Sequence, residues 1–161
     1  MARIELTTRI AAPLERCFDL SRSVELHTHS TAETGERAVA GRTSGLLELG
    51  EQVTWEARHF GVRQRLTSCI SAYDRPSHFR DSMVRGAFRR IDHDHYFTPD
   101  GNGGTIMRDV LEYDAPLGVL GRIAERLVLT AHLHRLLERR NEAIKSIAES
   151  DQWRSYGLPE H

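Results

Sequence analysis

The stretch FRDSMVRGAFRRIDHDHYF, residues 79–97, contains two runs of alternating apolar and polar residues separated by a turn around Gly86. Alternation with a period of two is typical of β-strands with one buried face. The run TIMRDVLEYDAPLG, residues 105–118, repeats the pattern after a glycine-rich segment. Connections this short join antiparallel strands, because a parallel crossover needs about a dozen residues. The three runs therefore predict neighbouring strands of an antiparallel sheet.

The same pattern extends the sheet toward the N-terminus. Two short helices or turns are expected after the first strand, at about 14–20 and 23–30, and the glycine-containing segment 33–45 reads as a loop or a weak edge strand. Seven strands are predicted, at residues 4–10, 46–49, 51–60, 62–73, 78–85, 88–98 and 105–113.

The last predicted element is a long helix that runs from after Pro116 to about Glu149, with Asp114 as a candidate N-cap. About thirty helical residues at ~1.5 Å each span roughly 45 Å, enough to cross a whole sheet. Residues 1–150 are therefore expected to form a single α+β domain. Residues 151–161 lack periodicity and are expected to be a loose tail, although Trp153 and Tyr156 could pack back.

The charge balance and the cysteines limit the class of protein. The chain has 22 basic and 23 acidic residues, which argues against a protein that grips nucleic acid. We see no signal peptide and no apolar run long enough to cross a membrane, so we expect a cytoplasmic protein. Two free thiols, Cys17 and Cys69, are the simpler interpretation, with one disulfide left open.

The segments quoted above, together with GLLELGEQVTWEARHFG at residues 45–61, resemble the SRPBCC superfamily. This group includes START, Bet v1-like and polyketide cyclase/dehydratase-like domains, and the chain looks most like its small stand-alone bacterial members. The resemblance extends from Ile4 to about Ala148. It implies a helix-grip fold, in which a curved seven-stranded sheet surrounds the C-terminal helix and a central cavity. Such cavities take lipid-, polyketide- or quinone-like molecules, and no universal catalytic motif can be transferred to this chain.

Alternation also predicts which side chains face that cavity, because one strand residue in two points inward. The inward sets combine aromatic and methionine side chains with charged ones, and unpaired charges are costly in a dry core. Asp81 belongs to this set as a candidate for recognising a polar group. The expected ligand-binding residues are Trp55, His59, Phe79, Met83, His93, His95, Phe97, Met107, Asp109, Leu111 and Tyr113.

Strand register sharpens this expectation. If the Gly86 turn pairs Arg85 with Arg89, Asp81 lies opposite His93, and if Phe97 pairs with Thr105, Asp109 lies opposite His93 from the other side. Two carboxylates would raise the pKa of His93 and hold it charged. The cluster could be a satisfied buried network, an anchor for a ligand, or a general acid–base group.

Histidines at alternate positions, His93 and His95, also invite a metal interpretation together with His59, His27 and His29. No known spacing motif supports it, so we expect neither a metal nor another cofactor.

The preferred function is binding or carriage of a small, mainly hydrophobic molecule. One alternative is a cyclase/dehydratase-type enzyme whose catalytic candidates are His93, His95, Asp81 and Asp109. A second alternative is a regulatory module at a protein or membrane surface. We expect no nucleic-acid partner and no integral membrane segment. The oligomeric state stays open, a homodimer included.

Overall fold

The computed structural model describes residues 1–115 and 122–159, without the side chains of 122–125. One antiparallel sheet has the strand order β1-β7-β6-β5-β4-β3-β2. Its strands are β1 (Ala2–Ile10), β2 (Arg37–Gly41), β3 (Gln52–His59), β4 (Val62–Asp74), β5 (His78–Arg85), β6 (Arg90–Pro99) and β7 (Thr105–Asp114). The helices are α1 (Leu14–Ser21), α2 (Val24–Ser30), α3 (Arg122–Ala148) and two short 3-10 helices, η1 (Ala32–Thr34) and η2 (Asp151–Tyr156).

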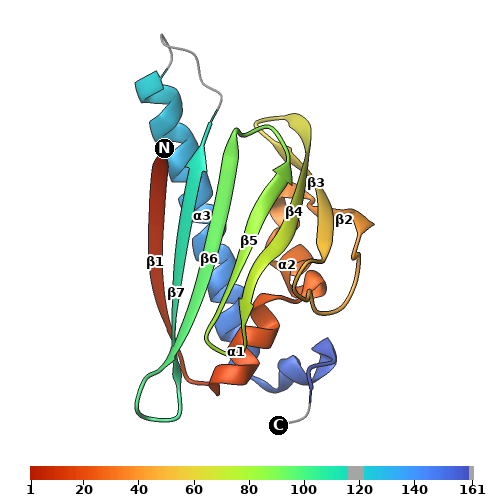
Figure 1. The fold of residues 1–161 in the computed structure, drawn as a ribbon. Coiled ribbons are helices and arrows are strands. Elements are labelled where there is room, and N and C mark those ends of the chain that lie inside the picture. Colours follow the sequence, from red (N-terminus) through yellow and green to blue (C-terminus); the bar gives the residue numbers. More distant parts are fainter. Residues whose placement is uncertain (116–121, 160–161) are drawn as a thin grey trace.

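The curved sheet grips α3, which passes behind the strands as drawn in Figure 1. The helix α1 lies at the lower end of the sheet, and α2 lies higher, toward β3 and β2. Alternation in the strands supplies one apolar face, and the helices cover it. Phe18 of α1 anchors the main core, because its ring makes edge contacts with Tyr73, Phe79 and Phe97 at centroid distances of 5.3–5.4 Å. A second cluster, around Tyr113 and Leu137, joins the other part of the sheet to α3.

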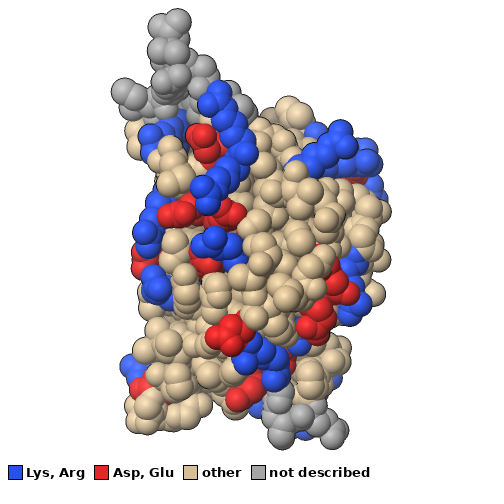
Figure 2. Space-filling model, viewed as in Figure 1, with Lys and Arg blue, Asp and Glu red and all other residues tan. Residues whose placement is uncertain are grey.

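The opposite face of the sheet is polar. Figure 2 shows Lys and Arg mixed with Asp and Glu, beside a broad area with few charges over the middle of the sheet. Uncharged pairs join neighbouring strands on this face, such as the Ser71 and Ser82 hydroxyls at 2.8 Å. Arg80 and Asp94 form an ion pair across β5 and β6. The helix-covered face is therefore the one that can hold an apolar ligand.

The seventh strand lies elsewhere than predicted. Residues 46–49 do not form a strand; Leu46 makes only an isolated bridge to Ser23, and Leu47 is buried in the main core. The edge strand is instead β2, within the segment predicted as a loop or weak edge strand. The prediction at 46–49 fails because Leu47 alone of these residues is buried and Leu49 is exposed. The strand β2 gave little signal because it is mostly exposed and lacks a buried alternating set.

The C-terminal part agrees with the expected long helix and corrects the expected loose tail. The predicted helix start after Pro116 lies outside the described residues, and Asp114 is the last residue of β7. Residues Asp151–Tyr156 form η2, and Trp153, Tyr156 and Leu158 pack against the main core. Packing back thus replaces the loose tail, because the partial burial of two aromatic side chains offsets the entropy of ordering the segment.

Two further expectations concern the cysteines and the membrane. Cys17 and Cys69 are both free thiols. Within the described part of the chain, no helix has the length and apolar character needed to cross a membrane.

Candidate functional site

A cavity of about 220 Å³ lies between the inner face of the sheet, α2 and α3. Its volume is far above the ~30 Å³ share of one water molecule and somewhat below the ~300–1,000 Å³ of typical drug-sized sites. The wall is mainly apolar because strand alternation and the α3 stripe both turn large aliphatic and aromatic side chains inward. These side chains are Trp55, Ala57, Leu66, Ile70, Phe79, Phe88, Ile91, Leu111, Tyr113, Leu133, Leu136 and Leu137.

One end of the cavity is polar and is formed by β5 and β6. The predicted pairing of Asp81 with His93 is confirmed by the register of these strands. The predicted pairing of Asp109 with His93 is wrong, because Asp109 lies opposite His95. Pro99, not Phe97, pairs with Thr105, so the connecting loop is shorter than expected. The observed β6–β7 pairing differs from the predicted pairing by two residues. Because strand side chains alternate with a period of two, each side chain stays on its predicted face of the sheet, and Asp109 still contacts His93.

Asp109 is the centre of this polar cluster and is fully buried. Its Oδ1 lies 3.0 Å from His93 Nε2 and 2.9 Å from His95 Nδ1. From α3, Arg140 Nη1 reaches the same oxygen at 3.2 Å, and Asn141 Nδ2 donates to Oδ2 at 2.8 Å. A single carboxylate thus fixes both histidines and joins the sheet to the long helix.

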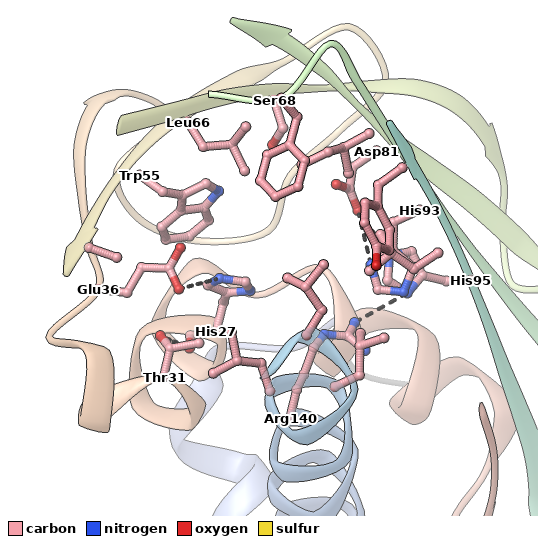
Figure 3. Close-up of a pocket in the computed structure, with 18 of the residues that line it drawn as sticks. His27, Thr31, Glu36, Trp55, Leu66, Ser68, Asp81, His93, His95 and Arg140 are labelled. Carbon is pink, nitrogen blue, oxygen red and sulfur yellow. Dashed lines mark hydrogen bonds and ion pairs between the residues drawn. The ribbon is translucent and has the colours of Figure 1, made fainter. Parts of the chain in front are cut away.

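Asp81 lies on the cavity side of the histidines. Its Oδ2 is 2.9 Å from His95 Nε2 and 3.9 Å from His93 Nδ1. Asp81, His93 and His95 all line the cavity, as Figure 3 shows. Asp109 contacts the other ring nitrogen of each histidine and is not part of the described lining. One carboxylate and two imidazole nitrogens therefore face the space where a ligand would bind.

Burial and mutual contacts set the protonation of this cluster. Burial raises the pKa of Asp109, but hydrogen bonds from both histidines and the charge of Arg140 outweigh burial and hold it well below its ordinary value. Burial also lowers the pKa of His93 to about 4, assisted by the neighbouring His95. The prediction that the carboxylates keep His93 charged is therefore wrong, because the cost of burying an imidazolium exceeds their attraction. His93 is neutral at neutral pH.

The opposite end of the cavity has a second polar group that the sequence prediction missed. His27 of α2 stacks on Trp55 with ring centroids 4.2 Å apart, and its Nε2 is 3.4 Å from Glu36 Oε2. His27 Nε2 is buried, and within the described part of the chain this long contact with Glu36 is its one polar contact. Burial raises the pKa of Glu36, but His27 and a hydrogen bond from Thr31 outweigh it and lower the pKa. Figure 3 shows this group across the cavity from His93 and His95.

The sequence does not predict Glu36 as a site residue, because it immediately precedes β2 in the segment expected to be a loop or a weak edge strand. The available signal is His27, which the sequence offers only in the metal interpretation together with His29. His59 lines the cavity as expected, but its Nδ1 pairs at 3.0 Å with His132 Nε2 of α3.

Most predicted ligand-binding residues line the cavity: Trp55, His59, Phe79, His93, His95, Leu111 and Tyr113. Four others do not belong to the described lining. Phe97 and Met107 are buried in the main core because α1 covers that part of the sheet, with Phe18 against Phe97. Asp109 lies behind the histidines, and Met83 packs near the Gly86 turn.

A curved sheet that grips one long helix around a cavity defines the START/Bet v1-like class of helix-grip proteins. Residues 1–149 match the family model described as "Polyketide cyclase / dehydrase and lipid transport", and the chain belongs to this family. No relative among curated proteins matches the chain significantly.

Solved structures share the fold at low sequence identity. A protein of Thermus thermophilus is 22% identical with a TM-score of 0.70, covering 91% of this chain and 99% of that one. The Zhui aromatase/cyclase of a Streptomyces species, R1128, is 14% identical with a TM-score of 0.72, covering 92% and 93%. A START superfamily protein of Mycobacterium smegmatis is 16% identical with a TM-score of 0.66, covering 91% and 97%.

Proposed function

We propose that the protein binds a compact, mainly apolar molecule that carries a polar group at each end. The observation that carries this proposal is the cavity itself, whose apolar wall separates the His93–His95 end from the His27–Glu36 end. His27 Nε2 is buried and makes only a long 3.4 Å contact with Glu36 Oε2, so a ligand that offers a closer hydrogen-bond partner there gains affinity. The family's description, which names polyketides and lipids, supports such a ligand.

The cavity volume favours a small ring system over a long acyl chain. About 220 Å³ lies below the range that holds most drug-sized molecules, and an extended lipid needs more room than they do. A polyketide- or quinone-like molecule of two fused rings is the size that we favour. Its polar groups would sit on opposite edges of the rings, one toward each end of the cavity.

The test uses two probes, 1,5-dihydroxynaphthalene, which has hydroxyls on opposite edges, and 1-naphthol, which has one. Titration followed by quenching of tryptophan fluorescence is expected to show tighter binding of the diol, because Trp55 lines the cavity. Ala57→Phe fills part of the cavity and should weaken diol binding at least about tenfold. Its matched control, Ala40→Phe, lies on the exposed edge strand β2 and should bind as the unchanged protein does. Equal affinity in both variants, or no binding of either probe, contradicts the proposal.

A second candidate is an enzyme of the cyclase or dehydratase type, and one observation favours it. Asp109 accepts from His93 Nε2, which leaves His93 Nδ1 on the cavity side as an acceptor for a proton. A base is most effective when its pKa lies near the working pH, and the pKa of His93 is only about 4. Binding without chemistry therefore ranks first. This ranking would be reversed if the protein turned over a ligand, and if His93→Asn abolished that turnover while still binding the ligand.

A further inference from the structure

Three metal-ligating side chains converge at the β5–β6 end of the cavity. Asp81 is paired with His93 across the strands, and His95 follows two residues later on the same face. One carboxylate oxygen and two imidazole nitrogens lie within 4.8 Å of one another. Asp81 Oδ2 is 2.9 Å from His95 Nε2 and 3.9 Å from His93 Nδ1. A metal at ~2.0–2.2 Å from each ligand keeps ligand atoms about 3–4 Å apart, so the group needs little movement to surround one ion.

Asp109 contacts only one ring nitrogen of each histidine, so the other ring nitrogen of each faces Asp81. Asp109 lies on the other side of both rings, and its Oδ1 is 3.0 Å from His93 Nε2 and 2.9 Å from His95 Nδ1. His93 Nδ1 and His95 Nε2 are therefore the ring nitrogens that face Asp81 Oδ2. Imidazole nitrogens and carboxylate oxygens are ligand atoms that Zn²⁺ binds. A bound cation takes the place of the direct contact between Asp81 Oδ2 and His95 Nε2.

The positive charge of Arg140 lies on the Asp109 side of the rings. Arg140 Nη1 is 3.2 Å from Asp109 Oδ1, and its Nη2 is 3.3 Å from His95 Nδ1. Asn141 donates to the second oxygen of Asp109, so both carboxylate oxygens are held by α3. Histidines that bind a metal usually donate their other ring N–H to a carboxylate in this way.

We infer that Asp81, His93 and His95 form a binding site for a divalent transition-metal ion such as Zn²⁺ or Fe²⁺, with Asp109 orienting both histidines. Two imidazoles and one carboxylate suit these ions, and such a set leaves coordination positions open. All three ligands line the cavity, so the open positions face the ligand space. A polar atom of a bound molecule can occupy one of them. The inference does not depend on which organic molecule the cavity takes.

The experiment titrates the full-length protein, first stripped with EDTA, with Co²⁺ and Zn²⁺. One equivalent of Co²⁺ is expected to produce visible absorption bands, and Zn²⁺ is expected to displace it in calorimetry. Asp81→Asn and His95→Asn should each weaken Zn²⁺ binding at least about tenfold, and Asp109→Asn by about 10- to 100-fold. His78→Asn is the matched control, because His78 pairs with Asp94 on the outer face of the sheet at 2.7 Å and should bind Zn²⁺ normally.

Circular dichroism and thermal unfolding establish that each variant is folded. Asp81 is partly exposed, so Asp81→Asn is the variant expected to fold even if a change at buried His95 does not. Absence of binding at millimolar Zn²⁺, or unchanged binding in folded Asp81→Asn, overturns the inference. So does loss of binding in His27→Asn or His59→Asn in place of these variants. Binding of 1,5-dihydroxynaphthalene to the stripped protein is measured in parallel, so failure of the metal site and failure of the cavity proposal are told apart.

Discussion

Asp109 shows how much a single side chain organises in this protein. It is fully buried, and the groups that contact its two oxygens come from β6 and α3. A buried carboxylate needs several donors to offset the loss of hydration, and here four side chains supply them. Because Asp109 contacts Nε2 of His93 and Nδ1 of His95, the other ring nitrogen of each histidine faces the cavity. Stability and the chemistry of the site therefore depend on one residue.

Asp109→Asn is expected to lower the free energy of unfolding by about 3 kcal/mol. The amide keeps the shape but leaves Arg140 buried without its carboxylate. Urea unfolding followed by circular dichroism measures the change. The control Glu5→Gln removes an exposed carboxylate from surface ion pairs with Arg3 and Arg108 and should have a small effect. Similar losses in both variants would mean that Asp109 is not the structural centre described here.

At the scale of elements, Asp19 attaches α1 to the turn between β4 and β5. Its carboxylate is 2.7 Å from Arg22 Nη2 and 2.6 Å from Arg75 Nη2, and it is fully buried. Burial raises the pKa of Asp19, but the hydrogen bonds from Arg75 and Arg22 outweigh burial and leave the pKa lowered. The helix that covers the Phe97 end of the sheet is thus held by an ion pair as well as by Phe18.

This lowered pKa predicts a pH dependence. The unfolded chain takes up a proton at Asp19 near its ordinary pKa, before the folded protein does, so the stabilisation is present above about pH 4 and is lost as the pH falls below it. Asp19→Asn should cost about 3 kcal/mol at pH 7. The difference between the unchanged protein and the variant should shrink as unfolding is measured at progressively lower pH. A difference that stays constant down to about pH 2.5 would contradict the assignment.

The edge strand β2 ends at Gly41, whose backbone has φ +71°. A Cβ at this position would lie 2.3 Å from the carbonyl oxygen of Gln52, and backbone cannot move aside cheaply. Gly41→Ala is expected to lower the free energy of unfolding by about 2–3 kcal/mol. Gly35→Ala is the control, because φ is +61° there but nothing lies within 4 Å, so only the conformational cost of about 1–2 kcal/mol remains. Thermal unfolding of the two variants should show this order.

At the scale of the whole molecule, the C-terminal segment covers part of the main core. Trp153 and Tyr156 pack against the main core, and the Arg16 guanidinium lies 4.1 Å from the centre of the Trp153 ring. Deleting residues 151–161 is expected to lower the free energy of unfolding by about 2 kcal/mol, because this apolar contact is lost. Chemical unfolding of the full and truncated chains measures it. Identical midpoints and slopes would restore the interpretation of a loose tail.

The sequence by itself determined the strands other than β2, and the faces of the sheet. Alternation is a local property, so β5 was predicted at its observed bounds and β3, β4, β6 and β7 within about two residues. The predicted faces of the strands were also correct where the predicted β6–β7 register was wrong. The shift in β6–β7 was two residues, which is one full period, and Asp109 still met His93 and His95.

Only the tertiary structure decided what depends on distant segments. The pKa of His93 follows from burial by the whole fold, which outweighs the neighbouring carboxylates that sequence makes visible. Glu36 reaches His27 because β2 pairs at the far edge of the sheet, a contact without a periodic signal. Arg140 and Asn141 meet Asp109 because α3 crosses the sheet at a particular rotation, which packing sets. Local patterns fix which side of an element is apolar, whereas packing fixes which polar groups meet inside.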